Sequence, residues 1–336
     1  MITAKELSKL LGLSEAAVSM ALNGRPGVSD ATRERVLAAA REYGYDFSRI
    51  KEKQFEREHA EGNLLFLIYK KHGAVVADTP FFSELTQGIE AETRGSGYRL
   101  IVRYLYEEDS RAMLESAKKE GCAGAVILGT EMSEDDLTLI QNLPFPFVLL
   151  DTYFEGASYD SVLINNVQGA YLAANYLISK YRTQAGYLRS AYPINNFSER
   201  ADGFYKAIRK CGLSPSRSIV HHLTPSAEGA YSDMLELLDR GEPLARCYFA
   251  DNDLIAAGAM RAFTERGKRI PQDVAVVGFD DIPLCGYTSP TLTTVRVPKQ
   301  EMGRAAAKRL LEKIKDGHTP PVKIEIGTIL IRRASA

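Results

Sequence analysis

From residue 63 onward the chain alternates short apolar runs with amphipathic stretches, and this alternation restricts the possible fold more than any other feature. A first series runs from NLLFLIY (63–69) to PFVLLD (146–151), and a second from SVLINN (161–166) to DVAVVGFDD (273–281). Strands that alternate with helices form parallel sheets connected by right-handed crossovers. The two series therefore predict an α/β fold with two doubly wound parallel-sheet lobes rather than one overlong sheet.

The first 46 residues have a different pattern, that of three short helices. Thr3 and Glu6 have the spacing of a capping box, while Ser14 and Ser29 are candidate N-caps of a second and a third helix. In a helix–turn–helix, the second helix enters the major groove, and residues near its N-terminus face the bases. The segment therefore predicts a helix–turn–helix head that binds DNA. A small bundle that only packs on the main body would show the same pattern.

The charge of this head is close to neutral. Residues 1–50 hold seven Lys and Arg against six Asp and Glu, a net charge of +1, and the whole chain carries −1. Because phosphate neutralisation supplies most non-specific affinity for DNA, one head alone is expected to bind weakly. A dimer would double the contacts.

Residues 47–61, FSRIKEKQFEREHAE, are almost all charged or polar and predict a linker or hinge. The start of the chain has no basic region followed by an apolar stretch, and no apolar run approaches the roughly 18 residues of a membrane span. A cytoplasmic protein with no membrane partner is therefore expected.

The sequence lacks the motifs that would indicate an enzyme or a metal site. GxSxG, Walker A and GxGxxG patterns are absent, so no enzyme activity and no cofactor are expected. His221 and His222 fall on an expected strand, where neighbouring side chains face opposite sides, so joint metal binding is not expected. The four cysteines are widely spaced in or near apolar runs, which predicts reduced thiols in a core: Cys122, Cys211, Cys247 and Cys285.

Three long stretches carry a resemblance to a known family. They are TAKELSKLLGLSEAAVSMALNGRPGVSDATRERVLAAAREYGY (3–45), FADNDLIAAGAMRAFTERGKRIPQDVAVVGFDD (249–281) and SPTLTTVRVPKQEMGRAAA (289–307). The chain resembles the lactose/galactose repressor (LacI/GalR) family, in the same order over nearly its whole length. The resemblance implies a helix–turn–helix head (1–46), a linker (47–61), and a two-lobed effector-binding and dimerisation unit (62–336) similar to type I periplasmic binding proteins.

The same resemblance implies which residues of the head contact DNA. The base readers would be Glu15, Ala16 and Met20, although many relatives have arginine at the position of Met20. In the linker the family usually carries a leucine that wedges into the minor groove, for which only Ile50 or Phe55 could substitute here. The DNA-binding candidates, including short polar side chains suited to the phosphate backbone, are Thr3, Ser14, Glu15, Ala16, Ser19, Met20 and Asn23.

Polar residues follow several of the expected strands and predict a ligand site between the lobes, where two-lobed α/β sensors bind. A mixture of carboxylates, Arg and Asn can bind the hydroxyls of a polyol, and an aromatic face can stack on its C–H bonds. With no tryptophan in the chain, Tyr153, Tyr192 or Tyr231 could add such a face. The family's effector positions and aromatic slot fall on Phe81, Phe82, Asp151, Asn196, Arg200, Asn252 and Asp280.

Neighbouring residues have simpler interpretations. Asp253 is expected to be the N-cap of the helix at 254–267, and Asp281 a turn residue. Of the two phenylalanines, one is expected in the core and the other at the cleft. Asn165 stands where relatives often have Asp, in a loop that connects the lobes.

These observations predict a DNA-binding transcriptional regulator that acts as a repressor and forms a homodimer. Its binding to a double-stranded DNA operator is expected to be controlled by a small polar effector, which is expected to be a carbohydrate. Alternatives are a regulator that senses a nucleobase or another co-effector, and a metabolite sensor with weakened operator binding. The first lobe is expected at about 62–160 plus 293–320, and the second at about 161–290 plus 322–334.

Overall fold

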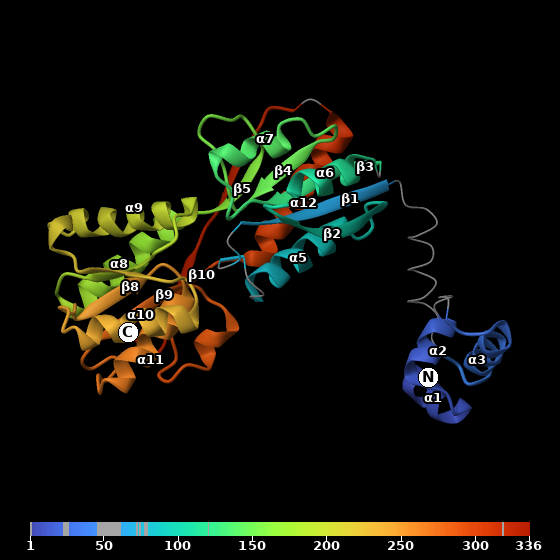
Figure 1. Cartoon of the computed structure of the whole chain (residues 1–336), viewed down its shortest axis with the longest axis horizontal. Coiled ribbons are helices and arrows are strands. Elements are labelled where there is room, and N and C mark those ends of the chain that lie inside the picture. The colour runs from blue at the N-terminus through green and yellow to red at the C-terminus, as the bar shows by residue number, and fades with distance from the viewer. Residues whose placement is uncertain are drawn as a thin grey trace. The chain divides into compact units, whose positions relative to one another are not determined.

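The computed structural model describes residues 2–22, 27–45, 62–71, 73, 75–76, 80–119, 121–317 and 319–336. The chain forms two compact units, residues 1–61 and 62–336 (Figure 1). Within the described residues, none of the helices combines the length and the apolar character that crossing a membrane requires.

The head contains the three expected helices, and short-range capping explains where each begins. The hydroxyl of Thr3 accepts from the Glu6 amide, and the Glu6 carboxylate accepts from the Thr3 amide at 2.8 Å. The Ser14 hydroxyl caps the second helix and that of Ser29 the third. The helices are α1 (Ala4–Leu11), α2 (Glu15–Leu22) and α3 (Asp30–Glu42).

A small apolar core holds these helices together. Its buried members come from all three helices: Leu7, Val18, Ala21, Leu22, Val36, Ala39 and Ala40. Because α2 buries Val18, Ala21 and Leu22, the opposite side of its first turn faces outward. The head therefore exposes the part of α2 that a helix–turn–helix inserts into DNA.

The first lobe is built on a six-stranded sheet in which every neighbouring pair is parallel. The strands, in spatial order, are β11 (Lys323–Ile326), β5 (Ser161–Ile164), β4 (Phe147–Leu150), β3 (Cys122–Leu128), β1 (Gly62–Lys70) and β2 (Tyr98–Tyr106). The helical segments of this lobe are α5 (Pro80–Thr93), α6 (Ser110–Lys119), η1 (Glu134–Asp136), α7 (Leu137–Ile140) and α12 (Lys299–Asp316).

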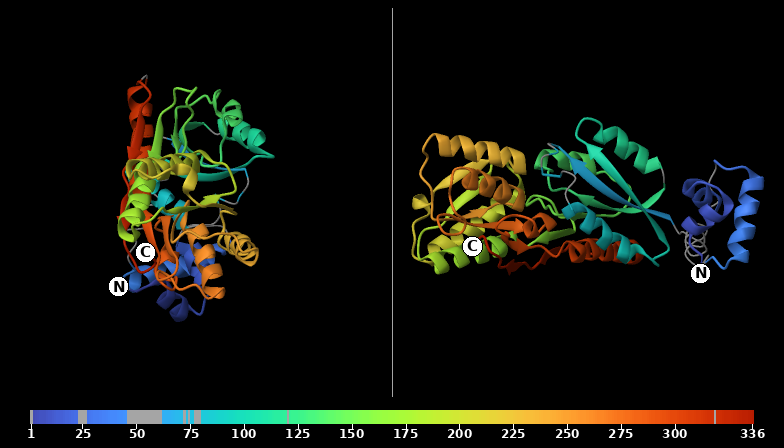
Figure 2. Two further views of the ribbon diagram at one scale, coloured as in Figure 1. Left: turned by 90° about the vertical axis from the view of Figure 1, so that its left-hand side faces the viewer. Right: turned by 90° about the horizontal axis from the view of Figure 1, so that it is seen from below.

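The second lobe repeats the plan with one antiparallel edge strand, β12. Its strands, in spatial order, are β12 (Ile329–Ile331), β10 (Thr293–Arg296), β9 (Ala275–Asp280), β8 (Cys247–Ala250), β6 (Gly186–Ser190) and β7 (Val220–Leu223). Its helical segments are α8 (Asn166–Tyr181), α9 (Asn195–Lys210), η2 (Pro215–Arg217), α10 (Ala227–Asp239), α11 (Asp253–Glu265) and η3 (Pro283–Gly286). Figure 2 shows both lobes from two further sides. The predicted α/β fold with two parallel-sheet lobes is confirmed.

The lobe boundaries differ from those expected. β5 pairs with β4 and β11 in the first sheet, whereas it was expected to open the second lobe. Conversely, β10 pairs with β9 in the second sheet, whereas α12 and β11 after it belong to the first lobe, although β11 was expected in the second. The chain thus crosses between lobes after β5, β10 and β11. Apolar strands of the two lobes look alike in sequence, so only their hydrogen-bonded partners reveal these crossings.

Two glycines allow α5 and α12 to pack closely in the first lobe. A Cβ on Gly88 would lie 2.1 Å from the carbonyl oxygen of Gln300, and one on Gly303 would lie 2.2 Å from that of Leu85. Any larger residue at either position would push the helices apart. This contact fixes the start of α5, where Phe81 and Phe82 lie.

Candidate functional site

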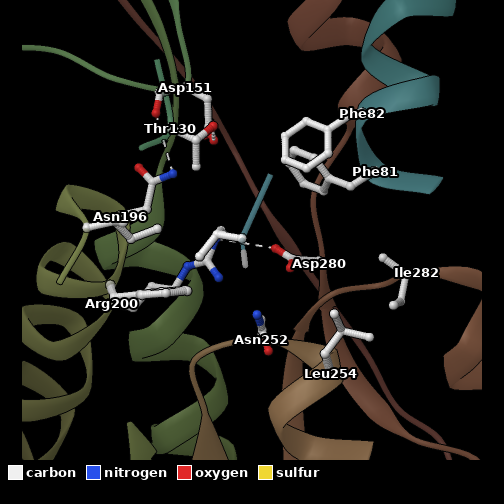
Figure 3. A pocket seen from close by; sticks show the side chains of 13 residues that line it. Phe81, Phe82, Thr130, Asp151, Asn196, Arg200, Asn252, Leu254, Asp280 and Ile282 are labelled. Carbon is white, nitrogen blue, oxygen red and sulfur yellow. Dashed lines mark hydrogen bonds and ion pairs between the residues drawn. The ribbon is translucent and has the colours of Figure 1, made fainter. Parts of the chain in front are cut away.

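The seven residues expected at the effector site all line one pocket of the larger unit (Figure 3). They arrive from both lobes: Phe81 and Phe82 on α5, and Asp151 after β4, belong to the first lobe. The second lobe contributes the other four, Asn196, Arg200, Asn252 and Asp280. The pocket lies at the carboxyl ends of parallel strands, where ligands of open α/β sheets bind.

Arg200 is the only cation among the residues that line this pocket, and it is held from several sides. Its side chain is 3% exposed, its Nε donates to Asn166 Oδ1 at 2.9 Å, and one terminal nitrogen donates to the Asp251 carbonyl. The other terminal nitrogen lies 3.3 Å from Asp280 Oδ1. The guanidinium also stacks over Phe279, 3.8 Å from the ring centroid. Such a group is already fixed before a ligand arrives.

Both carboxylates of the pocket lie on unusual backbone. Asp151 has φ of 62° and Asp280 has φ of 110°, and within the described residues the other positive φ values outside glycine belong to Arg182 and Asp281. A left-handed conformation costs free energy in residues that carry a Cβ, and such strain is concentrated at functional sites. The strained turns aim the two carboxylates into the space between the lobes (Figure 3).

Burial raises the pKa of both carboxyl groups. The pKa of Asp151 rises to about 6, although the Thr130 hydroxyl and the charge of Arg200 act in the opposite direction. That of Asp280 is also above its ordinary value because burial outweighs the charges of Arg200 and Lys299. Two carboxylates against one guanidinium give the pocket a negative balance when they are ionised.

Asp151 has one oxygen without a protein partner. Its Oδ2 accepts from the Thr130 hydroxyl at 2.7 Å, whereas Oδ1 is buried and accepts no hydrogen bond. The Asn196 amide group is near enough to lower the pKa of Asp151 but donates to the backbone carbonyl of Asp151 at 3.5 Å. Within the described residues, only Tyr181 has another such buried side-chain atom. A buried acceptor without a donor is costly, and a hydroxyl of a bound molecule would satisfy it.

The two asparagines are oriented by hydrogen bonds outside the pocket. Asn196 accepts from the Asn166 amide group at 3.2 Å and donates weakly to the Asp151 carbonyl at 3.5 Å. Asn252 is the N-cap of α11, and its Oδ1 accepts from the Ile255 amide at 2.8 Å. Capping therefore leaves the NH₂ group of Asn252 directed at the pocket (Figure 3).

Phe81 and Phe82 form the aromatic wall and meet edge to face. Their ring centroids are 5.2 Å apart at an interplanar angle of 68°. Phe81 is buried and Phe82 half-buried, yet both line the pocket, so neither is only a core residue as expected for one of them. The pocket thus joins an apolar wall to a polar floor.

In the head, the residues expected to contact DNA differ in how exposed their side chains are. Glu15, Ala16 and Ser19 are exposed on α2, and Thr3 and Ser14 are exposed caps. Met20 is half-buried, and its sulfur would lie 2.9 Å from a Cβ built on Gly27. Asn23, together with Ile50 and Phe55 of the expected hinge, lies outside the described residues.

Comparisons with known proteins assign both units. Residues 3–47 match the model of the lacI family of bacterial regulatory proteins, and residues 174–336 match a periplasmic binding protein-like domain. The whole chain is 30% identical to the HTH-type transcriptional regulator GalR of Escherichia coli, 96% of which it covers. The chain belongs to the LacI family.

Two further relatives extend the comparison. This LacI-family chain is 29% identical to the ribose operon repressor of Escherichia coli, over the full length of both proteins. It is 28% identical to a LacI family regulator of Enterococcus faecium solved with bound ribose, with a TM-score of 0.69, over 81% of this chain and 98% of that one. The protein is therefore a helix–turn–helix transcriptional repressor that binds operator DNA and a small-molecule effector.

Several pocket residues of this LacI-family protein were missed from the sequence. They are Val75, Thr130, Ile194, Phe197, Leu254 and Ile282. Thr130 is a polar residue that follows β3, so the rule that found Asp151 would have found it, whereas Val75 is apolar and gave no such signal. Ile194, Phe197 and Arg200 have helical spacing, which also was a usable signal.

Two expectations about residues near the pocket were wrong. Asp253 is not the N-cap of α11, because Asn252 has that role. The Asp253 carboxylate instead accepts from the Ile282 amide and the Thr294 hydroxyl inside the second lobe, and burial raises its pKa. The three suggested tyrosines, Tyr153, Tyr192 and Tyr231, do not line the pocket. Phe197 provides the additional aromatic ring instead.

Other expectations have mixed outcomes. Asp281 is more than a turn residue, since its carboxylate accepts from Arg296 and Arg333. Burial alone would raise its pKa, but these bonds outweigh burial and lower it. His221 is buried and His222 exposed, so they face opposite sides as predicted. Cys247 and Cys285 are buried in the core as predicted. Cys122 is half-buried, and Cys211, at the end of α9, is exposed, so the prediction of a core thiol is wrong for Cys211.

Proposed function

We propose that the effector of this repressor is a neutral monosaccharide held between the lobes. The unpaired Oδ1 of Asp151 carries the proposal, because it needs a donor, and sugar hydroxyls are donors. Asp280 supplies further acceptors, while Arg200 and the NH₂ group of Asn252 supply donors. Phe81 and Phe82 offer the apolar face on which sugar C–H bonds pack. The ribose bound by the Enterococcus faecium relative supports this class of ligand.

The charge of the pocket argues against anionic effectors. A sugar phosphate would bring its charge next to Asp151 and Asp280, with Arg200 as the only compensating cation among the lining residues. Burial has already raised the pKa of both carboxyl groups, so an added anion would be costly. We therefore expect phosphorylated sugars and nucleotides to bind poorly.

Thermal unfolding in the presence of single compounds tests this proposal. The panel comprises neutral pentoses and hexoses, their phosphates, and purine bases, each at large excess over the protein. A binder at 100 times its Kd stabilises the folded state by about 2.7 kcal/mol, which shifts the unfolding midpoint clearly. Stabilisation by a neutral monosaccharide and not by its phosphate supports the proposal. Stabilisation by a purine base alone would replace it with the nucleobase alternative.

We also propose that the bound sugar leaves unchanged. The titratable side chains that line the pocket are Asp151, Arg200 and Asp280, and Asp280 is already engaged by Arg200. Neither carboxyl group has a histidine, lysine or cysteine among the lining residues as a partner for acid–base or nucleophilic chemistry. Recovery of the sugar unaltered after long incubation is expected, and an isomerised product would contradict it.

On the DNA side, we propose that Glu15 and Ala16 read bases while Thr3, Ser14, Ser19 and Asn23 contact the phosphate backbone. Support comes from the exposure of α2 at its N-terminus, where amides can also bind a phosphate. Selection of duplexes from a random pool at low salt is expected to enrich a palindromic operator. If no sequence is enriched, the metabolite-sensor alternative is favoured.

Met20 limits the affinity of the head in this proposal, because its thioether packs on Gly27 and cannot donate a hydrogen bond. The substitution Met20→Arg adds one cation at the recognition helix, so DNA should bind more tightly. The slope of log K against log salt should steepen by about 1 for each added phosphate contact. Fluorescence anisotropy at several salt concentrations measures this, with Met20→Leu as an uncharged control. An unchanged slope in Met20→Arg would show that residue 20 adds no phosphate contact, and unchanged affinity as well would show that it does not reach the DNA.

We propose a homodimer that pairs two such heads. One head carries a net charge of only +1, so two are needed for useful affinity. In the first lobe β2 is an edge strand, and it exposes Val102, Tyr104 and Tyr106 by 41–50%. Such an exposed apolar edge is a surface that proteins usually cover. Sedimentation is expected to give a dimer, and Tyr104→Glu should shift it toward the monomer; a wild-type monomer at micromolar concentration would refute this arrangement.

A further inference from the structure

Glu131 is a buried carboxylate that lies outside the pocket and has no role in the function described above. It follows Thr130 in the turn after β3, and its side chain is turned toward the segment that follows β1. Residue 131 is 4% exposed. An acidic residue this deeply buried requires strong compensation, so its partners indicate what it does.

Four backbone amides donate to this single side chain. Oε2 accepts from Lys71 at 2.7 Å and from Gly73 at 3.2 Å. Oε1 accepts from Val75 at 3.0 Å and from Val76 at 2.9 Å. The carboxylate thus takes the position that an anion has in a backbone nest, with the difference that the anion belongs to the chain itself.

The segment held in this way forms part of the pocket wall. Val75 lines the pocket, and Val76 is buried in the core against which Phe81 packs. In the same turn, the Thr130 hydroxyl donates to Asp151. One turn after β3 therefore fixes the Asp151 carboxylate through Thr130 and the Val75 part of the pocket wall through Glu131.

We propose that Glu131 is a positioning residue that sets effector affinity by holding Val75 against the bound molecule. This inference rests on the proposed role of the pocket as the effector site. Glu131 is not among the residues that line the pocket. It acts through the four amides, which lose their shared acceptor if the carboxylate is removed.

The substitution Glu131→Gln tests the inference because it keeps the shape of the side chain. One carboxylate oxygen becomes an NH₂ group, a donor that faces amide donors, so two of the four hydrogen bonds are lost. Effector binding should weaken about tenfold or more, since bonds to charged acceptors are the stronger class. Glu134→Gln, with the same change at an exposed position three residues later, should bind as the wild type does.

A double-mutant cycle separates positioning from a general loss of stability. Val75→Ala removes the wall contact directly, so if Glu131 acts through Val75, the double variant should bind about as weakly as Glu131→Gln alone. Additive losses from the two substitutions would overturn the inference. The probe is the panel compound with the largest thermal shift, bound to the full chain and titrated calorimetrically well below the unfolding midpoint.

Amide hydrogen exchange provides a measurement that needs no bound molecule. In Glu131→Gln, exchange should accelerate at residues 71, 73, 75 and 76 and stay unchanged in the second lobe. Unchanged exchange at these four amides overturns the inference, and so does faster exchange with unaltered affinity. If the wild type binds no panel compound, the monosaccharide proposal fails, whereas faster exchange at the four amides of Glu131→Gln would still show that Glu131 holds this part of the pocket wall.

Discussion

Replacing Arg200 with methionine is expected to abolish the response of operator binding to effector. The variant loses the three hydrogen bonds that the guanidinium group donates to Asn166, to the Asp251 carbonyl and to Asp280. It also leaves Asp280, whose side chain is 18% exposed, without this cation, and breaking a largely buried ion pair costs up to about 3–5 kcal/mol. Effector affinity should fall by more than about a hundredfold, because both the donor and the geometry of its neighbours are lost.

Two matched variants make this result interpretable. Arg209→Met makes the same change at the exposed end of α9 and should leave effector binding and stability unaltered. Arg200→Lys keeps the charge but cannot donate in three fixed directions or stack on Phe279, so it should recover little of the affinity. Circular dichroism of each variant establishes folding, and calorimetry measures effector binding. Full recovery in Arg200→Lys would show that charge alone matters and would contradict the proposed geometry.

Short-range signals explain why the head could be predicted from sequence. The capping interactions of Thr3, Ser14 and Ser29 depend on residues three positions away, so local sequence determines them. The strand–helix alternation likewise predicted two parallel sheets. The sheet to which each strand belongs could not be predicted for β5 and β10, because both resemble the other apolar strands, and only their pairing with β4 and β9 assigns them.

Pocket residues could be predicted where a polar side chain directly follows a strand, and less well elsewhere. Asp151 and Asp280 were found in this way, whereas the role of Asp253 was misassigned because two adjacent polar residues competed for one cap. The cap went to Asn252, which freed Asp253 to bond inside the lobe. Glu131 gave no sequence signal, since its four partners are backbone amides about 60 residues earlier in the chain.

Replacing Asp151 with asparagine is expected to stabilise the protein and weaken effector binding at once. Asparagine tolerates the left-handed backbone of residue 151 as well as aspartate does, so the substitution changes little besides charge. In the wild type, burial raises the pKa of Asp151 to about 6. Ionising this carboxyl group at neutral pH therefore works against folding.

The sign of the pH dependence follows from that raised pKa. A carboxyl group with a folded pKa above its unfolded value contributes stability at acidic pH, and the contribution is lost as pH rises through about 6. Near pH 4 the wild type and Asp151→Asn should unfold at the same denaturant concentration. At pH 8 the variant should be more stable, by on the order of 2–3 kcal/mol for a shift of about two pKa units. Equal stability at both pH values would show that Asp151 is not desolvated.

Effector binding should respond to the same substitution in the opposite direction. A sugar hydroxyl gains most from the unpaired Oδ1 when the carboxyl group is ionised, so wild-type affinity should rise between pH 5 and 7. In Asp151→Asn this rise should disappear, with affinity at pH 8 lower by about 10- to 100-fold, the range for a lost charge-assisted hydrogen bond. Calorimetric titrations at four pH values measure both effects. Because the orphaned oxygen destabilises the free protein and is satisfied by the bound one, part of the effector's binding free energy comes from relieving that cost.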